Sequence, residues 1–287
     1  MNYIIANSAN EMQISLCQQL LESGTEASPR GLETREVLGF AFEIKNPRNR
    51  LTSLKARKWS PSLAAAELAW HLRGDTDVEA LAFYTPRWRD FADTDGQVRG
   101  SCYGARIFEP LAGKGSQWNN VRNLLNSDHQ SRRAVLNFRI EEDVSRPTKD
   151  LSCTNTLQFI IRDRKLHAFT NMRSNDAIWG VPYDVFLFTI LQEMMALELG
   201  TELGSYHHYA SSMHVYKRHY ELAIRVASAA AYDTGEMPAM TSTDGLYAMA
   251  NEESSLRLTG KRSRKPLGAF EEYCLDLLGK HENLSAA

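Results

Sequence analysis

One cysteine, Cys153, stands at the end of a polar loop and directly before a run of strand-forming residues. Cysteine is a nucleophile when it is partly exposed and near positive charge, because both conditions favour the thiolate. Basic residues lie close to Cys153 in the sequence. A lone cysteine is more often a small buried residue of the core, so the nucleophilic interpretation depends on the surroundings.

A second group of candidates lies in the segment Asn171–Asp176, which concentrates arginine, serine, asparagine and aspartate. Guanidinium and hydroxyl groups donate hydrogen bonds to phosphate oxygens, so Arg173 and Ser174 indicate an oxyanion site. A solvated polar turn is the structural alternative. The adjacent Arg132 and Arg133 allow the same two interpretations, and a solvated pair is the commoner one.

The sequence does not favour a metal site. His207, His208 and His214 lie close together, but no carboxylate stands at ligand spacing from them. Structural or substrate hydrogen bonds are therefore the expected role of these histidines. The four cysteines form no CxxC pair, so we expect neither a disulfide framework nor zinc.

The elements that position these residues follow from apolar periodicity and from Gly and Pro signals. We expect helices over residues 9–22, 62–73, 116–129, 185–199 and 270–278. We expect strands over 36–44 and 134–140, a hairpin of 156–162 and 165–171 turned at Asp163-Arg164, β character over 206–209 and 213–216, and loops over 232–265. Strands and helices do not alternate regularly, which indicates an α+β fold.

Size and charge limit the function. The 287 residues carry a net charge of −2, which gives no general attraction to nucleic acid or anionic membranes. A nucleotide monomer therefore fits better than a polymer. No apolar run reaches the roughly 20 residues that span a bilayer. The N-terminus lacks the basic region of a signal peptide. We predict one domain over residues 1–287, in the cytoplasm.

Read together, these segments resemble the thymidylate synthase family. The resemblance covers about residues 30 to 222 and rests on the order of its motifs. The motifs are Cys153-Thr154-Asn155-Thr156-Leu157-Gln158-Phe159, Asn171-Met172-Arg173-Ser174-Asn175-Asp176, Gly180-Val181-Pro182-Tyr183-Asp184 and His214-Val215-Tyr216. Further matches are Glu67 before Trp70 and Gly74-Asp75-Thr76, Tyr103-Gly104, and Ser131-Arg132-Arg133.

The resemblance implies a three-layer fold with a mixed sheet flanked by helices, and a homodimer formed through the sheet face. It implies 5,10-methylenetetrahydrofolate as one-carbon donor, with no metal. For catalysis it implies that Cys153 is the nucleophile and that Glu67 activates water. For the nucleotide it implies that the phosphate is bound by Arg173, Ser174 and the partner-donated Arg132 and Arg133, that the sugar is bound by His214 and Tyr216, and that Tyr103 lies near the base. It places Trp88 and Asp176 in the folate region.

Asp184 points away from a methylating synthase, because uracil-specific members of the family carry Asn at this position. An amide can donate to O4 and accept from N3–H of uracil, whereas cytosine presents an N4 donor and an N3 acceptor. A carboxyl accepts from N4 and, when protonated, donates to N3. A helix N-cap is the structural alternative for Asp184. The sequence Cys-Thr-Asn-Thr also resembles the phage deoxycytidylate hydroxymethylases.

The sequence leaves several points open. We expect a deoxycytidylate hydroxymethylase; a cytidylate hydroxymethylase, a thymidylate synthase acting on deoxyuridylate and a catalytically dead nucleotide- or RNA-binding relative are the alternatives. Ser174 weakly favours the deoxy sugar. Arg30 or Arg35 is the expected N-terminal phosphate ligand, with Arg30 nearer the family position. The last residues, 283–287, lack the aliphatic ending that the resemblance implies for closure over folate.

Overall fold

The computed structural model of the chain describes residues 2–110, 113–139, 145, 147–232, 235–262 and 267–281. Residues 283–287, for which an aliphatic ending was expected, lie outside the described part. Internal contacts divide the chain into two compact units, each described by itself. The first unit comprises Met1–Trp59, Cys153–Gln192 and Glu202–Met237, and the second comprises Ser60–Ser152, Glu193–Thr201 and Pro238–Ala287. A single domain over 1–287 stays a prediction.

The first unit is built on a mixed sheet with the strand order β1-β3-β8-β6-β5, in which β2 pairs with β3 and β7 with β8. Strand β3 is parallel to β1 and antiparallel to β8, and β6 is parallel to β8 and antiparallel to β5. This mixed sheet confirms the predicted α+β class. The strands are β1 Asn2–Ala6, β2 Thr25–Ala27, β3 Thr34–Ile44, β5 Thr154–Arg162, β6 Lys165–Met172, β7 Asn175–Asp176 and β8 Glu202–Tyr216.

The hairpin of β5 and β6 turns where the sequence predicted. Asp163 and Arg164 have φ values of 50° and 61°, and two consecutive residues with positive φ are typical of a type I′ turn. The two predicted β segments near residues 206–216 are parts of one long strand, β8. The hairpin and β8 therefore lie side by side and carry most of the candidate residues of this unit.

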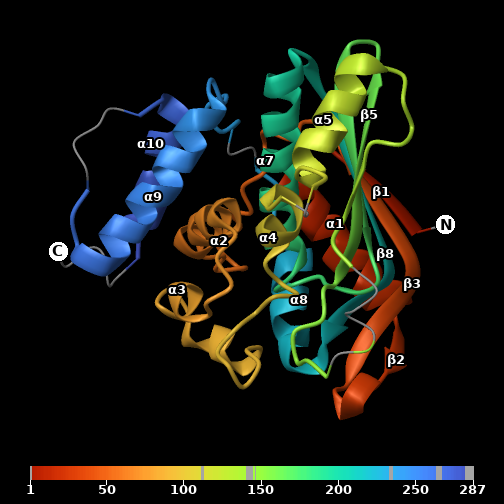
Figure 1. Ribbon diagram of the computed structural model, residues 1–287. Helices are drawn as coiled ribbons and strands as arrows, with labels where there is room; N and C mark the ends of the chain where they lie inside the picture. Colours follow the sequence, from red (N-terminus) through yellow and green to blue (C-terminus); the bar gives the residue numbers. More distant parts are fainter. Residues whose placement is uncertain are drawn as a thin grey trace. The chain divides into compact units, whose positions relative to one another are not determined.

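Helices α1 (Ala9–Ser23) and α8 (Tyr220–Ala227) pack against the sheet of the first unit (Figure 1). The Ser8 side chain caps α1 by accepting a hydrogen bond from the Glu11 amide, as expected for an N-cap. Helix α7 (Val181–Leu199) is fixed to β6 and β8 by Gln192, whose Nε2 donates to the carbonyls of Leu166 at 2.9 Å and Gly204 at 3.0 Å. These bonds hold the helix that carries Asp184.

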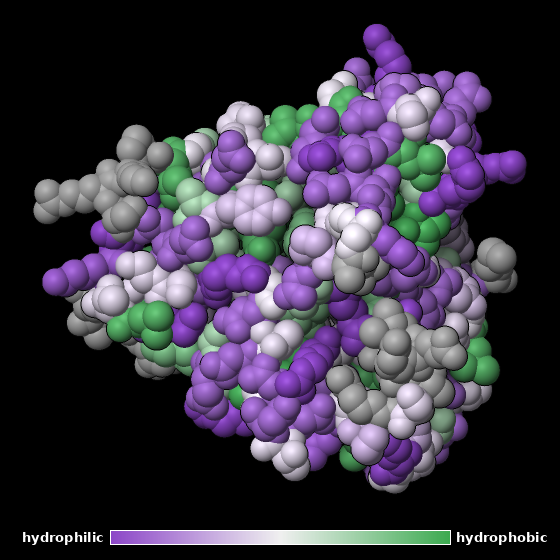
Figure 2. All heavy atoms as spheres, viewed as in Figure 1, coloured by the Kyte–Doolittle hydropathy of each residue, from purple (hydrophilic) through white to green (hydrophobic). Residues whose placement is uncertain are grey.

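The two faces of the sheet differ in burial. On the inner face Phe40, Phe42 and Ile44 are completely buried. Ile5 of β1 is 57% exposed, and Leu38 of β3 is 68% exposed; Leu38 stands before Gly39, whose φ of 67° interrupts the alternation that follows from Phe40 to Ile44. Polar residues dominate the molecular face seen in Figure 2, and its apolar residues form small separate groups. Scattered apolar residues are normal on a protein surface.

The second unit is mainly helical. Helix α2 (Pro61–Arg73) begins with the Ser60 side chain accepting from the Leu63 amide and ends at Gly74, whose φ of 64° favours glycine. It packs against α4, α9 and α10. The other elements are α3 Glu79–Ala82, η2 Pro86–Asp90, α4 Tyr103–Phe108, α5 Gln117–Ser127, β4 Val135–Asn137, α9 Thr243–Thr259 and α10 Ala269–Leu278. The predicted strand over 134–140 is thus shorter, and Ile140 lies outside the described residues.

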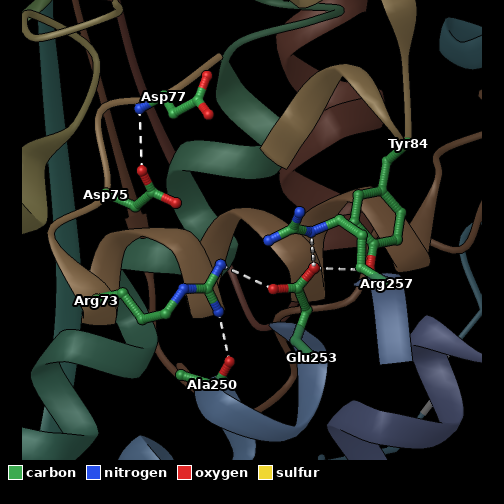
Figure 3. Close-up of polar contacts among 7 residues, drawn as sticks. All are labelled: Arg73, Asp75, Asp77, Tyr84, Ala250, Glu253 and Arg257. Atoms are coloured by element: carbon green, nitrogen blue, oxygen red, sulfur yellow. Dashed lines mark hydrogen bonds and ion pairs between the residues drawn. The ribbon is translucent and has the colours of Figure 1, made fainter. Parts of the chain in front are cut away.

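The prediction of loops over residues 232–265 is wrong for the segment that forms α9. This helix starts after Ser242, ends at Gly260 and buries Leu246 and Met249. Its polar residues conceal the pattern, because Glu253 is 1% exposed although glutamate is rarely buried. Figure 3 shows the reason: Glu253 is surrounded by hydrogen-bond and ion-pair partners from distant parts of the chain.

Among the described residues no helix combines the length and the apolar character that crossing a membrane requires. Within the same residues no three His, Cys, Asp or Glu side chains are grouped in a way that could hold a metal ion.

Candidate active site

Cys153 lies directly before β5 and is half-buried. The Arg173 Nη2 atom is 3.5 Å from its Sγ, and the Arg173 amide donates to the Cys153 carbonyl at 2.9 Å. The end of β6 thus fixes the cysteine and places a guanidinium beside its sulfur. A nearby cation stabilises a thiolate, which is the nucleophilic form of cysteine.

The other three cysteines are unsuited to this chemistry. Burial raises the pKa of Cys17 and of Cys102 to about 12. Cys274 is fully buried. Cys153 is therefore the cysteine with both the exposure and the charged neighbour that a nucleophile requires.

The short strand β7 positions Asp176 beside β8. Its carboxylate Oδ1 accepts from the amides of Ile178 at 2.8 Å and Trp179 at 3.2 Å, which shapes the turn before α7. Ser174 is half-buried next to Arg173. The segment is therefore a structured polar turn whose arginine and serine keep some access to solvent.

Strand β8 brings His214 opposite Asp176 in register. Burial lowers the pKa of His214 below its ordinary value, and the Asp176 carboxylate opposes that shift. The His214 and Tyr216 rings pack edge to face, with 5.0 Å between the ring centres and 89° between the ring planes. A neutral imidazole and a phenol held in this way can each donate and accept a hydrogen bond, as sugar hydroxyls require.

Asp184 lies in the first turn of α7 and keeps part of its surface exposed. Because it lies inside the helix rather than before it, the N-cap alternative is wrong. Burial raises the pKa of Asp184 from 3.8 to about 7, against the opposing effect of a hydrogen bond from Asn175. The carboxyl can therefore exist in both protonation states near neutral pH, as a general acid needs.

In the second unit, α2 carries Glu67, which is half-buried. The following residues of the helix gather the other candidates of this unit. Trp70 packs against Trp88 with 5.8 Å between the ring centres. His71 stacks on Tyr103 with 5.4 Å between the ring centres and an angle of 4° between the ring planes. Helix α2 thus links Glu67 to Trp88 and Tyr103.

The Tyr103-Gly104 pair is fixed by close packing. A Cβ on Gly104 would lie 1.6 Å from the His71 carbonyl oxygen, so only glycine permits this approach of α4 to α2. The preceding loop is held by Asp150, whose Oδ2 accepts from the amides of Gly100 at 2.7 Å and Ser101 at 2.9 Å. These contacts explain the Tyr-Gly sequence and define the position of the tyrosine.

Arg132 and Arg133 are exposed, whereas the preceding Ser131 is buried. The Ser131 amide donates to the Asp128 carbonyl at 3.1 Å and anchors the turn. The turn is thus fixed, and both guanidinium groups extend from it into solvent-accessible positions.

Of the two N-terminal candidates, Arg35 is engaged within the protein. Its Nη1 donates to the Leu21 carbonyl at 2.9 Å, and its guanidinium lies 5.5 Å from the Tyr220 ring centre. Arg30 is exposed on a short 3₁₀ turn with a φ of 54°. Arg30 is therefore the more exposed of the two arginines, and its role as a phosphate ligand stays a prediction.

Sequence reasoning missed Arg57, which is only 3% exposed. Its guanidinium lies 5.3 Å from the Trp179 ring centre, beside Tyr183 and Asp176. Within the described part of the chain, its Nε and Nη2 have no hydrogen-bond partner. In the sequence Arg57 is one of several closely spaced basic residues and carries no signal of its own. Its burial is the feature that draws attention to it, because buried donors normally have a hydrogen-bond acceptor.

The structure brings together two separate groups of predicted residues. Within the first unit it joins Cys153 to Arg173, and Asp176 to His214 and Tyr216. Within the second unit it assembles Trp88 and Tyr103 on the helix that carries Glu67. Arg132 and Arg133 belong to the second unit but stand on a separate turn.

Comparison with known proteins identifies the family. The thymidylate synthase family matches residues 12–255, which is most of the chain. The chain belongs to this family. The fold agrees, because thermostable thymidylate synthase A from Bacillus subtilis superposes with a TM-score of 0.69 at 23% identity, over 84% of this chain and 91% of that one.

A curated relative is similar in sequence as well. The deoxyuridylate hydroxymethyltransferase of Bacillus phage SP01 is 31% identical over 221 residues, which cover 72% of this chain. The match spans only 56% of the phage protein, so it extends over little more than half of that relative's length.

Proposed function

We propose that this protein is a pyrimidine nucleotide C5 hydroxymethyltransferase that converts deoxycytidylate, methylenetetrahydrofolate and water into 5-hydroxymethyl-deoxycytidylate and tetrahydrofolate. The observation that carries the choice of base is Asp184, a residue with part of its surface exposed, whose carboxyl pKa is raised by burial to about 7. Such a group can accept from the cytosine N4 amino group and donate to N3. The hydroxymethyl product is supported by the similarity to the phage deoxyuridylate hydroxymethyltransferase.

In this proposal Cys153 begins the reaction. Its thiolate, stabilised by Arg173, adds to C6 of the pyrimidine and turns C5 into a carbon nucleophile. Asp184 donates a proton to N3 as negative charge develops there. C5 takes the one-carbon unit that the folate supplies and then loses its proton. Loss of tetrahydrofolate leaves an exocyclic methylene group, and a water molecule activated by Glu67 adds to it. The bond between the Cys153 sulfur and C6 then breaks as N3 returns its proton to Asp184, which restores the C5–C6 double bond and frees the cysteine.

The remaining polar residues of the first unit bind the nucleotide. Arg173 and Ser174 take the phosphate, together with Arg30 rather than Arg35, since Arg35 already bonds to the Leu21 carbonyl. His214 and Tyr216 bind the sugar hydroxyl. Tyr103 of the second unit is assigned to the base.

Methylenetetrahydrofolate has a chemically suitable binding region. The buried Arg57 has two donors without partners among the described residues and stacks near Trp179, which suits a planar ring with hydrogen-bond acceptors. Asp176 lies beside this arginine, and Trp88 packs on Trp70 in the second unit. We assign Arg57 to the folate site with Asp176 and Trp88, and no metal enters the reaction.

A homodimer is part of the proposal. The outer face of the sheet exposes Tyr3, Ile5, Leu38 and Tyr209, which are 39% to 68% exposed. A sheet face of this kind is typical of a protein interface. We propose that it pairs with a second copy of the chain and that Arg132 and Arg133 reach the partner's phosphate site, in a cytoplasmic enzyme.

A second candidate is hydroxymethyl transfer to deoxyuridylate, which the name of the phage relative favours. Methylation of deoxyuridylate and hydroxymethylation of cytidylate remain the other enzymatic alternatives. A dead binding relative would not need the half-buried Cys153 beside Arg173. These possibilities differ in which C5–H bond is broken and in the form of folate released.

Tritium release from C5-labelled nucleotides distinguishes them. The protein is incubated with methylenetetrahydrofolate and labelled deoxycytidylate, deoxyuridylate or cytidylate, and absorbance of dihydrofolate is followed in parallel. We expect release from deoxycytidylate without dihydrofolate. Release from deoxyuridylate alone contradicts the proposed base, and formation of dihydrofolate contradicts hydroxymethylation.

Cysteine variants provide the control. Cys153→Ala should abolish tritium release while nucleotide binding persists in calorimetry. Cys274→Ala, at a buried cysteine of the second unit, should retain release. Equal loss in both variants would show damage to the fold rather than removal of a nucleophile.

A further inference from the structure

Three polar side chains occupy positions on the inner, buried face of the sheet. Thr170 on β6 and Tyr206 and His208 on β8 are 2%, 0% and 1% exposed. Their neighbours on this face are apolar residues such as Phe42 and Ala168. Polar groups in such a place destabilise a protein unless hydrogen bonds satisfy them. These three side chains therefore need hydrogen-bond partners within the core.

The bonds form a continuous row that starts at Asn175 on β7. Asn175 Nδ2 lies 3.1 Å from His208 Nε2, and His208 Nδ1 lies 2.9 Å from the Tyr206 hydroxyl. The Tyr206 hydroxyl donates to Thr170 Oγ1 at 2.9 Å. The row thus runs from a motif residue of the candidate site into the core.

The direction of these bonds follows from the donors. An amide nitrogen can only donate, so His208 Nε2 must accept and we assign its proton to Nδ1. Burial lowers the pKa of His208 to about 3, which keeps the ring neutral and consistent with one acceptor. Phe42 stacks on the His208 ring, with 4.6 Å between the ring centres and an angle of 5° between the ring planes, and this contact fixes the plane of the imidazole.

Asn175 connects this row to Asp184. A hydrogen bond that lowers the pKa of a carboxyl stabilises the carboxylate, so Asn175 donates its second amide proton to Asp184. Nδ2 also lies 2.7 Å from the Met172 sulfur, but a thioether is a weak acceptor. A Cβ on Gly180 would lie 2.3 Å from Asn175 Oδ1, so glycine in the motif leaves room for this amide orientation.

We propose that Asn175, His208, Tyr206 and Thr170 form a positioning row that orients the Asp184 carboxyl and so determines the selection between cytosine and uracil nucleotides. The inference rests on the proposed function. Because Asn175 donates to one oxygen of Asp184, the acid proton is directed to the other oxygen. The carboxyl then presents one fixed acceptor and one fixed donor to the base.

Without the acceptor on His208, the orientation of the Asn175 amide should no longer be fixed. The amide can then turn and point its oxygen toward Asp184, which destabilises the carboxylate form of Asp184 instead of stabilising it. His208→Gln keeps an acceptor near the position of Nε2, whereas His208→Phe keeps the stack on Phe42 without an acceptor. The two variants separate hydrogen bonding from ring packing.

The first test compares substrate preference. The ratio of kcat/KM for deoxycytidylate over deoxyuridylate should change about tenfold in His208→Phe and stay within about threefold in His208→Gln. Tyr206→Phe and Thr170→Val should give smaller changes in the same direction. If His208→Phe does not fold, these two variants decide. An unchanged ratio in every folded variant overturns the proposal.

The second test needs no activity, so it separates this inference from the proposed function. Nitrogen NMR of the wild-type imidazoles should show His208 as the Nδ1–H tautomer, and the opposite tautomer overturns the row. Carbon NMR should show the pKa of Asp184 rising by about one unit in His208→Phe but not in His208→Gln. If these results hold while neither nucleotide releases tritium, the proposed function fails and the row stands as a structural feature only.

Discussion

Asp184 in the first unit and Glu253 in the second are acidic side chains enclosed by protein, but their neighbours differ in charge. Glu253 is paired with Arg73 at 2.7 Å and Arg257 at 3.0 Å, and accepts from the Tyr84 hydroxyl at 2.9 Å (Figure 3). Asp184 has the neutral Asn175 as its hydrogen-bond partner. One carboxyl is surrounded by cations and the other by neutral groups.

The difference separates a structural acid from a functional one. Glu253 forms ion pairs with two arginines, and its pair with Arg73 joins α9 to α2. A carboxyl among neutral groups has no such compensation, so its pKa rises toward neutrality and it can exchange a proton with a ligand. Burial alone does not mark a functional acid; the charge of its neighbours does.

Removing the charge of Glu253 should have the largest effect on stability. Glu253→Gln leaves Arg73 and Arg257 without their counter-ion, and we expect a loss of about 3–5 kcal/mol in the free energy of unfolding. Urea denaturation at pH 7.5 measures it. Glu272→Gln is the matched control, because its ion pair with Arg262 is 38% and 39% exposed and should cost less than about 1 kcal/mol. Similar losses in both variants would remove the distinction between the two acids.

Replacing the Asp184 carboxyl by an amide should increase the free energy of unfolding, whereas the same replacement at Glu253 should decrease it. The folded pKa of about 7 exceeds the ordinary 3.8, so the native state binds the proton more tightly and loses stability as pH rises from about 4 to about 7. Asp184→Asn should therefore stabilise the protein by about 4 kcal/mol at pH 8.5 and hardly at pH 4. Denaturation at both pH values measures this. A loss of stability at pH 8.5 would contradict the raised pKa, and under the proposed function the variant should also shift preference toward uracil.

Much of this fold was predictable because local signals are strong. The helix expected over 9–22 forms Ala9–Ser23 with its Ser8 cap, and the hairpin turns at Asp163 and Arg164 as expected. The loop prediction over 232–265 failed because the burial of Glu253 depends on Arg73, which is far away in the sequence. Long-range ion pairs leave no local pattern.

The candidate site shows the same limit. Cys153 and Arg173 could be selected from sequence, and the structure joins them at 3.5 Å. His207 and His208 look equivalent in sequence, yet only His208 faces the core, because alternate residues of β8 lie on opposite faces of the sheet. Arg57 was missed for a similar reason, since its burial depends on tertiary packing.

The smallest effect concerns Tyr84, which completes the Glu253 cluster. Tyr84→Phe removes one hydrogen bond but leaves both arginines, so we expect a loss of about 1 kcal/mol. Burial and the Glu253 charge raise the pKa of Tyr84, so its hydroxyl keeps its proton and the loss should be equal at pH 6 and pH 9. Tyr247→Phe, at a tyrosine of α9 that is 39% exposed, is the control and should change stability by less than about 0.5 kcal/mol. A loss in Tyr84→Phe that grows between pH 6 and pH 9 would mean that this cluster titrates near neutral pH, as the Asp184 environment does, and the contrast between the two acids would no longer hold.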